Sequence, residues 1–167
     1  MIQVYTGDGK GKTTAALGLA LRAAGAGFKV YIGQFIKGSC YSELKALKKN
    51  RNIKIEQHGR GCFIKRNLLQ RDIDLAKKGL LRARQIIAQK KYKLIILDEI
   101  NVALYFGLLN LNEVISLLKE CPKGKDLVLT GRRAHPKVIK LADLVSEVRD
   151  VKHYYRRGVQ ARKGIEY

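Results

Sequence analysis

The chain has 167 residues, with 34 Lys and Arg against 14 Asp and Glu, so its formal net charge is +20. Hydrophobic residues make up 46% and charged residues 29%, a balance that supports a packed core and excludes a disordered chain. No apolar run approaches the roughly 18–20 residues of a membrane-spanning helix, and the N-terminus shows no secretory signal. We therefore expect one α/β domain over residues 1–167, located in the cytoplasm, with anionic partners.

Strand-like and helix-like segments alternate along the chain. In order, the apolar patterns predict a strand at 2–5, a helix at 13–26, a strand at 28–35, a helix at 43–49, a strand at 53–57, a basic glycine-rich loop at 59–66, a helix at 68–89, a strand at 93–100, a helix at 112–121, a strand at 126–130, a helix at 136–142 and a strand at 144–148. This alternation predicts a parallel sheet with helices on both faces and right-handed crossovers. We find no repeat or linker that marks a domain boundary.

The three cysteines, Cys40, Cys62 and Cys121, are widely spaced and form no C-x-x-C pair. A disulfide framework or a zinc site needs closer or paired spacing. We expect free thiols in a reducing compartment.

A phosphate-binding loop is predicted between the first strand and the first helix. The segment reads TGDGKGKTT, from Thr6 to Thr14, and only its first position departs from the G-x-x-x-x-G-K-[ST] pattern. Its glycines allow phosphate oxygens to approach the backbone, where successive N–H groups form an anion nest. The candidate nucleotide-binding residues are Gly7, Asp8, Gly9, Lys10, Gly11, Lys12, Thr13 and Thr14. We expect Lys12 to face the outer phosphates, the Thr13 hydroxyl to bind a divalent cation, and Asp8 to face a ribose hydroxyl or a metal-bound water.

Two acidic residues end the most apolar predicted strand. Asp98 and Glu99 follow the run LIIL, which is typical of a central parallel strand. A carboxylate at this point can hold the cation of a phosphate site, and we expect Glu99 to contact it directly and Asp98 to act through water. The alternative is that one of them only caps the next turn.

A further basic segment follows the predicted strand at 126–130. Ligands of open α/β folds bind at the carboxyl ends of the strands, where Gly131 and Arg132 are expected to lie. Arg132 is therefore a candidate phosphate ligand, and a solvated charge is the alternative. The histidines His58, His135 and His153 show no metal-ligand spacing. An ordinary structural role, such as a loop position for His58 and a helix cap for His135, is favoured over a ligand or substrate role, which stays the alternative.

Several separated segments resemble the P-loop type of ATP:corrinoid adenosyltransferases. They are the phosphate loop with the helix after it, QFIKG (34–38), GRG (59–61), LDEI (97–100), TGR (130–132), ADLVSEVRDVKH (142–153) and the terminus GVQARKGIEY (158–167). The resemblance runs from about residue 2 to residue 167. It implies a three-layer, P-loop NTPase-like (RecA-like) α/β fold with a mostly parallel central sheet.

The resemblance also implies an activity. Such enzymes transfer the 5′-deoxyadenosyl group of ATP to the cobalt(I) centre of a reduced corrinoid and release triphosphate. Cobalt is the nucleophile, so the protein holds the reactants in line and neutralises the leaving group. Lys12 and Arg132 are the catalytic candidates, and Thr13, Glu99 and Asp98 are the candidate ligands of Mg²⁺, with Mn²⁺ as the alternative ion.

The resemblance implies partners as well, and there the chain departs from the better-known members. Those members carry Phe and Trp after the G-x-G, packed on the corrin, whereas this chain has Cys62, Phe63 and Ile64 and no Trp, which leaves Phe63 as the corrinoid candidate. They also have an arm before the first strand that covers the site. We expect that cover to come from elsewhere, such as the second subunit of a homodimer, and we expect a flavoprotein reductant.

Two alternative functions remain open at this point. A kinase or ATPase that moves the γ-phosphate would use nearly the same loop residues. A nucleotide-gated nucleic-acid-binding protein would suit the net charge, but aromatic residues are only 7% and no RNA-binding signature is present, so we expect no nucleic-acid partner.

Overall fold

The computed structural model describes residues 1–39, 41–61 and 68–167. Its elements, in chain order, are β1 (Ile2–Thr6), α1 (Lys12–Gly25), β2 (Val30–Phe35), α2 (Ser42–Leu47), β3 (Ile53–His58), α3 (Gln70–Ala88), β4 (Leu94–Asp98), α4 (Ile100–Tyr105), α5 (Leu111–Lys119), β5 (Asp126–Thr130), α6 (Pro136–Leu141), β6 (Leu144–Glu147) and the short 3₁₀ helix η1 (Tyr154–Arg157).

The strands form one six-stranded sheet in the order β3-β2-β4-β5-β1-β6. Every pairing is parallel, from β2 with β3 at one edge to β1 with β6 at the other. The carboxyl ends of all strands therefore meet along the same side of the sheet. This confirms the predicted α/β class and the parallel sheet.

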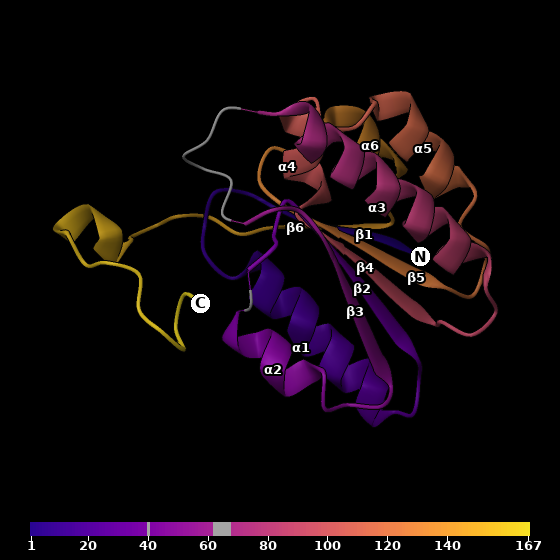
Figure 1. Cartoon of the computed structure of the whole chain (residues 1–167), viewed down its shortest axis with the longest axis horizontal. Coiled ribbons are helices and arrows are strands. Elements are labelled where there is room, and N and C mark those ends of the chain that lie inside the picture. Colours follow the sequence, from indigo (N-terminus) through magenta and orange to yellow (C-terminus); the bar gives the residue numbers. More distant parts are fainter. Residues whose placement is uncertain (40, 62–67) are drawn as a thin grey trace.

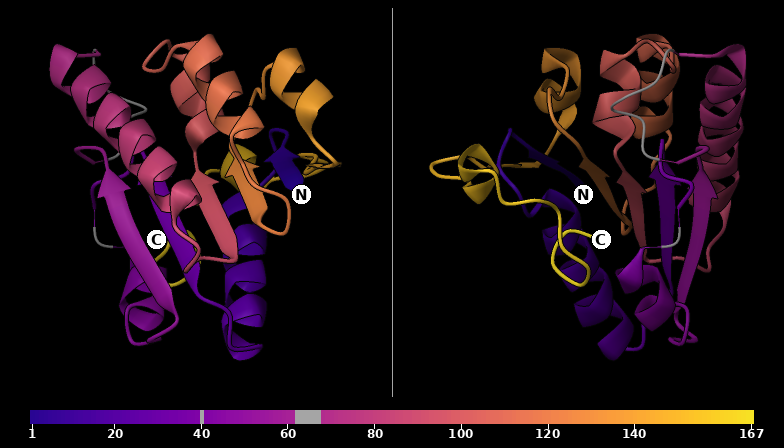
Figure 2. Two further views of the ribbon diagram at one scale, coloured as in Figure 1. Left: turned by 90° about the vertical axis from the view of Figure 1, so that its right-hand side faces the viewer. Right: turned by 60° about the vertical axis from the view of Figure 1, so that its left-hand side comes forward.

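Helices cover both faces of the sheet. Figure 1 shows α1 and α2 below the sheet and α3, α4, α5 and α6 above it, and the two turned views in Figure 2 keep this arrangement. Alternate residues of β4 supply the two cores because successive side chains of a strand point to opposite faces. Leu94 and Ile96 pack with α1, whereas Ile95 and Leu97 pack with the helices of the other face. The result is a three-layer structure.

One predicted strand is shorter in the structure, and a helix that was not predicted follows it. The expected strand at 93–100 ends at Asp98, Glu99 adopts a left-handed backbone with φ 61°, and α4 begins at Ile100. The predicted strand took in Ile100, and residues 101–105 were assigned to no element, because six residues are too few for a helical period to show clearly. The helix η1 in the C-terminal segment was likewise not predicted.

Other expectations have mixed outcomes. No helix among the described residues is long and apolar enough to cross a membrane. Cys121 is a free thiol, as expected. Cys40 and Cys62 lie outside the described residues, and so does the corrinoid candidate Phe63.

Candidate active site

The glycine-rich loop between β1 and α1 has the backbone shape of an anion nest. Helix α1 begins at Lys12, directly after Gly11, whose φ is 120°. Gly7 also has a positive φ, 95°. Residues with a side chain adopt such angles only with strain, so glycine lets the loop turn tightly and present its N–H groups at the start of the helix. A helix N-terminus of this kind favours phosphate.

The C-terminal segment packs directly on this loop. The backbone N–H of Gly9 donates to the carbonyl of Val148 over 2.7 Å. A Cβ atom on Gly7 would lie 2.5 Å from the Val148 carbonyl oxygen, and one on Gly9 would lie 2.6 Å from that of Arg149. Side chains at these positions would push the two segments apart. The glycines therefore serve the packing of the loop as well as its turn.

Lys12 is folded over the loop that it follows. Its side chain is buried, and its ammonium donates to the carbonyl of Gly9 over 2.5 Å. Burial lowers the pKa of Lys12, and the nearby guanidinium of Arg132 lowers it further. A polyphosphate in the loop would supply the negative charge that this ammonium lacks in the protein alone.

Lys10 points away from the nest, although its place in the loop predicted a nucleotide ligand. Its ammonium donates to the hydroxyl of Tyr154 (2.8 Å) and to the carboxylate of Glu166 (2.7 Å). Hydrogen bonds from Lys10 first, and then from Tyr154, hold the pKa of Glu166 at about 2. Lys10 thus joins the phosphate loop to the C-terminal segment in this structure.

A network of hydrogen bonds centres on Asp98, which is fully buried at the end of β4. Its Oδ1 accepts from the hydroxyls of Thr13 (2.8 Å) and Thr130 (2.6 Å). Its Oδ2 accepts from the amide of Gln34 (3.2 Å) and the ammonium of Lys37 (2.8 Å). Residues from the ends of β2, β4 and β5 thereby meet the first turn of α1 around one carboxylate.

Glu99 occupies the next position with a different environment. It is the N-cap residue of α4, but its side chain makes no capping hydrogen bond, so the alternative of a simple cap is wrong for Glu99. Burial raises the pKa of Glu99, and so does Asp98, while Lys37, Lys12 and Arg132 act in the opposite sense. Asp98, rather than Glu99, touches the Thr13 hydroxyl.

Backbone strain is concentrated at this edge of the sheet. Among the described residues, the non-glycine positions with positive φ are Ile36 (67°), Glu99 (61°) and Arg133 (55°). They follow β2, β4 and β5, all at the carboxyl ends. Such conformations cost of order 1–3 kcal/mol each and cluster at functional sites.

Close backbone contacts hold the segment after β2. A Cβ on Gly59 would lie 2.2 Å from the carbonyl carbon of Ile36, and one on Gly38 would lie 2.3 Å from the carbonyl oxygen of Gly59. Glycine at 38 and 59 is therefore required for the two loops to touch. This contact brings the segments QFIKG and GRG together.

Arg132 and Gly131 follow β5, as expected. The Arg132 guanidinium lies 4.0 Å from the carboxylate of Asp8, and both side chains are more than half exposed. Gly131 has φ 128° and passes so close to α4 that a Cβ would lie 3.1 Å from the Cβ of Asn101. Arg132 thus stands at the mouth of the loop, in reach of an incoming anion.

The structure adds three residues to the site that their sequence context left unassigned. They are Gln34, Lys37 and Thr130, the side-chain partners of Asp98 besides Thr13. The segments QFIKG and TGR contained them and served only as family signatures. A polar or charged residue directly after an apolar strand was the signal that could have found them.

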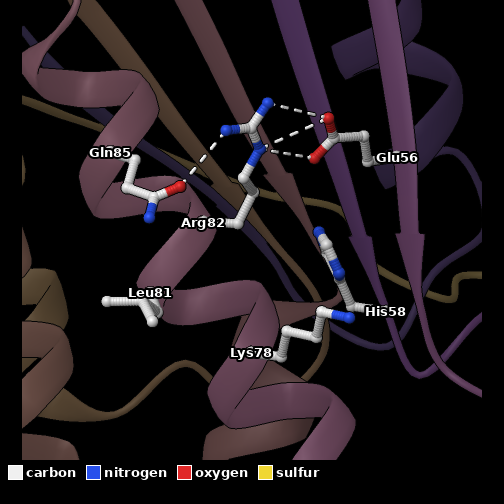
Figure 3. A pocket seen from close by; sticks show the side chains of 6 residues that line it. All are labelled: Glu56, His58, Lys78, Leu81, Arg82 and Gln85. Atoms are coloured by element: carbon white, nitrogen blue, oxygen red, sulfur yellow. Dashed lines mark hydrogen bonds and ion pairs between the residues drawn. The ribbon is translucent and has the colours of Figure 1, made fainter.

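The histidines have structural roles. His135 and His153 each accept a backbone N–H at the start of α6 and η1. His58 packs on Phe35 and lines a pocket between β3 and α3 (Figure 3), and no residue of the phosphate loop is among those that line it. The other side chains of that pocket are Glu56, Lys78, Leu81, Arg82 and Gln85.

Comparison with solved structures agrees with the fold. A KaiC-like protein from the hyperthermophilic archaeon Pyrococcus horikoshii OT3 superimposes with a TM-score of 0.57, over 87% of this chain and 71% of that one. Its sequence is 16% identical, so the likeness shows the fold alone. It supports the predicted P-loop NTPase-like architecture.

Sequence relatives are more informative. The chain is 37% identical to a corrinoid adenosyltransferase of Pseudomonas aeruginosa and 36% identical to that of Escherichia coli K12, in each case over 100% of this chain and 83% or 85% of the relative. The corrinoid adenosyltransferase CobA of Salmonella typhimurium is 35% identical over 100% of this chain and 85% of the relative. The family model for ATP:corrinoid adenosyltransferase BtuR/CobO/CobP matches residues 1–167. The chain therefore belongs to the ATP:corrinoid adenosyltransferase family, whose general function is the ATP-dependent adenosylation of corrinoids.

Proposed function

We propose that the carboxyl edge of the sheet binds ATP and delivers its 5′-deoxyadenosyl group to the cobalt(I) centre of a reduced corrinoid, with triphosphate as the leaving group. The Asp98 network carries the placement of the site, because it ties the phosphate loop to the ends of three strands, and the family membership supports adenosyl transfer as the reaction. The substrate's cobalt attacks C5′, so no residue of the chain needs to form a covalent bond. What the protein must supply is position and charge.

Neutralising the triphosphate is the main task of the chain's own residues. Negative charge develops on the leaving group as the C5′–O bond breaks, and fixed positive groups lower the energy of that state. Lys12, the N–H groups of the loop and Arg132 are the groups that face the nest or its mouth. Thr14 and Gly131 complete the loop and the strand end that shape the site.

The donor set fits a magnesium ion. Mg²⁺ prefers oxygen ligands and is usually bound by one or two carboxylates together with substrate phosphates and water. The Thr13 hydroxyl and the Asp98 carboxylate meet directly, and Glu99 lies beside them. When bound, the ion would neutralise phosphate charge. We assign Thr13 and Asp98 to direct contact and Glu99 to the adjacent position, which reverses the order expected for the two acids.

The remaining proposals concern the binding partners, the cellular location and the extent of the functional unit. A homodimer and a flavoprotein reductant are suggested by the family resemblance, a cytoplasmic location is suggested by the few unpaired cysteines, and a net charge of +20 suits anionic partners. We also propose that residues 1–167 act as one unit and that Phe63 packs on the corrinoid.

An anaerobic assay tests the assignment of Lys12. Chemically reduced cobalamin, ATP and Mg²⁺ are mixed with the protein, and the corrinoid spectrum is followed. We expect Lys12→Ala to lower the rate by at least about 100-fold, because removal of one such preorganised donor has effects of that order. The matched control is Lys29→Ala, whose ammonium bonds Asn52 far from the loop.

Equal rates for wild type and Lys12→Ala would contradict the proposed role of the loop. Comparable losses in Lys12→Ala and Lys29→Ala would point to a general effect on the protein.

A further inference from the structure

Lys37 bridges the two side chains to which we assign the cation. Its ammonium lies 2.8 Å from Oδ2 of Asp98 and 3.2 Å from the hydroxyl oxygen of Thr13. A single positive group thus contacts a carboxylate oxygen and a hydroxyl oxygen at once. These are the contacts that a divalent ion would make.

The backbone is built to hold Lys37 there. Ile36, the residue before it, has φ 67°, which is a genuine outlier for a β-branched side chain. The loop that contains Gly59 packs against the Ile36 carbonyl and fixes this turn. The Lys37 side chain is 18% exposed, and that of Asp98 is 0% exposed. A strained turn and a close loop contact together place one lysine beside one buried carboxylate.

The buried carboxylate needs a positive partner at all times. Leaving one charge of a buried pair uncompensated is strongly destabilising, by about 3–5 kcal/mol in measured cases. Lys12 does not fill this role, because its ammonium is turned to the carbonyl of Gly9. Lys37 is the ammonium that donates to Asp98.

We propose that Lys37 is a built-in substitute for the divalent cation. In the protein without nucleotide, its ammonium neutralises Asp98 and competes with a metal ion for Thr13 and Asp98. An ion can enter only when it displaces the ammonium, and the phosphates of a nucleotide supply the further ligands that make this favourable. Lys37 is thus a positioning residue that couples ion binding to nucleotide binding. The inference rests on the cation site of the proposed function.

The inference is tested by whether replacing Lys37 strengthens or weakens the binding of a divalent ion. Binding of Mn²⁺ alone, without nucleotide, is measured by electron paramagnetic resonance for wild type and Lys37→Met. We expect Lys37→Met to bind Mn²⁺ at least about 10-fold more tightly, because the competing ammonium is gone and Asp98 lacks a positive partner. A lysine that only supported the loop would leave Mn²⁺ affinity unchanged or weaken it.

Two control variants sharpen the result. Lys37→Arg keeps the positive charge and should retain the wild-type affinity. Lys29→Met removes a lysine that bonds the neutral Asn52 and Arg51 carbonyl, and it should leave Mn²⁺ binding unchanged. If the Lys37→Met protein does not fold stably enough for the binding measurement, Lys37→Gln is measured instead. A rise in its melting temperature with added Mn²⁺ that exceeds the wild-type rise supports the proposal, and an equal or smaller rise contradicts it.

Asp98→Asn separates this inference from the cation site itself. If Asp98→Asn weakens Mn²⁺ binding but Lys37→Met does not strengthen it, the cation site stands and the role of Lys37 is overturned. If Asp98→Asn changes Mn²⁺ binding in neither the wild-type nor the Lys37→Met background, the assigned cation site fails and the inference fails with it. Tighter binding in Lys37→Met that Asp98→Asn abolishes supports both.

Discussion

Each end of the parallel sheet holds a lysine with little exposure to solvent, and the two lysines have different partners. At the amino ends of the strands, Lys125 precedes β5 and is 9% exposed, and its ammonium donates to the main-chain carbonyls of Ile87 (2.8 Å) and Gln89. At the carboxyl ends, Lys37 donates to the carboxylate of Asp98. Lys125 satisfies carbonyls at the end of α3 that the helix leaves free, and its charge complements the helix dipole.

This difference separates a structural end from a functional end. The partners of Lys125 are neutral carbonyls of the backbone, so this lysine is not paired with a carboxylate. The partners of Lys37 are a carboxylate and a hydroxyl, which are also ligands for metal ions. The left-handed residues Ile36, Glu99 and Arg133 all follow strands at the carboxyl side. Within the part of the chain that the structure describes, the strained non-glycine residues and the lysine paired with a buried carboxylate therefore lie at the same end of the sheet.

The largest expected effect comes from Gly59→Ala, which acts on the functional end through the backbone. The new methyl group would lie 2.2 Å from the carbonyl of Ile36, so the segment that carries Lys37 must shift. A displacement near 1 Å can lower an enzyme rate by about 100-fold. We expect an effect of that order on kcat/KM in the corrinoid assay.

Gly18→Ala is the matched control. Gly18 lies in α1, and a methyl group added there would meet nothing within 4 Å, so alanine should leave activity unchanged and stabilise the helix by about 0.5–1 kcal/mol. If Gly59→Ala retained full activity, the contact between the two loops would have no part in shaping the site.

At the other end of the sheet, Lys125→Met should affect stability and spare the chemistry. Methionine keeps an unbranched stem but leaves the carbonyls of Ile87 and Gln89 without their donor. We expect a loss of about 1–3 kcal/mol in the free energy of unfolding, measured with urea. The rate per folded molecule should equal that of wild type, and a large fall in that rate would contradict the separation of the two ends.

A smaller effect is expected from Glu56→Gln in the pocket of Figure 3. Burial alone would raise the pKa of Glu56, but hydrogen bonds from Arg82, Lys54 and Tyr31 outweigh it and hold the pKa at about 2. Because the folded pKa lies below the ordinary value of 4.5, the ionised group stabilises the protein above about pH 4.5. That contribution is lost as the pH falls towards 2.

Urea unfolding at several pH values checks this prediction. Glu56→Gln should be less stable than wild type at pH 7, and the gap should narrow between about pH 4.5 and 2, because glutamine does not titrate. A gap that stays constant over this range would show that Glu56 is not the titrating group.

The sequence was sufficient for the fold and for the phosphate loop, and insufficient for side-chain direction. Alternating apolar segments predicted the parallel sheet, and the GKT segment placed Lys12 and Thr13 at the start of α1. For the two adjacent acids we expected Glu99 to make the direct contact, whereas Asp98 is the one that accepts from the Thr13 hydroxyl. The chain turns at Glu99 through a left-handed backbone, and no sequence pattern announces that turn.

Lys37 shows the same limit more clearly. Its position depends on the left-handed Ile36 and on Gly59, which lies 22 positions after Lys37 in the chain. Local patterns cannot foresee a turn that is held by a distant loop, because tertiary contacts override local preference there. Lys10 was predicted to bind the nucleotide, but its ammonium contacts Tyr154 and Glu166. Local sequence could not show this, because both partners lie more than 140 positions later in the chain.

The identity of the phosphate product tests the central claim most directly. An anaerobic reaction with ATP, Mg²⁺ and reduced cobalamin is analysed by ³¹P nuclear magnetic resonance, and the adenosylated corrinoid is counted from its spectrum. The proposed transfer breaks the bond between C5′ and its oxygen, so we expect one triphosphate for each adenosylcobalamin. ADP with phosphate or a phosphorylated acceptor, without adenosylcobalamin, would contradict the account and leave a kinase or ATPase in its place.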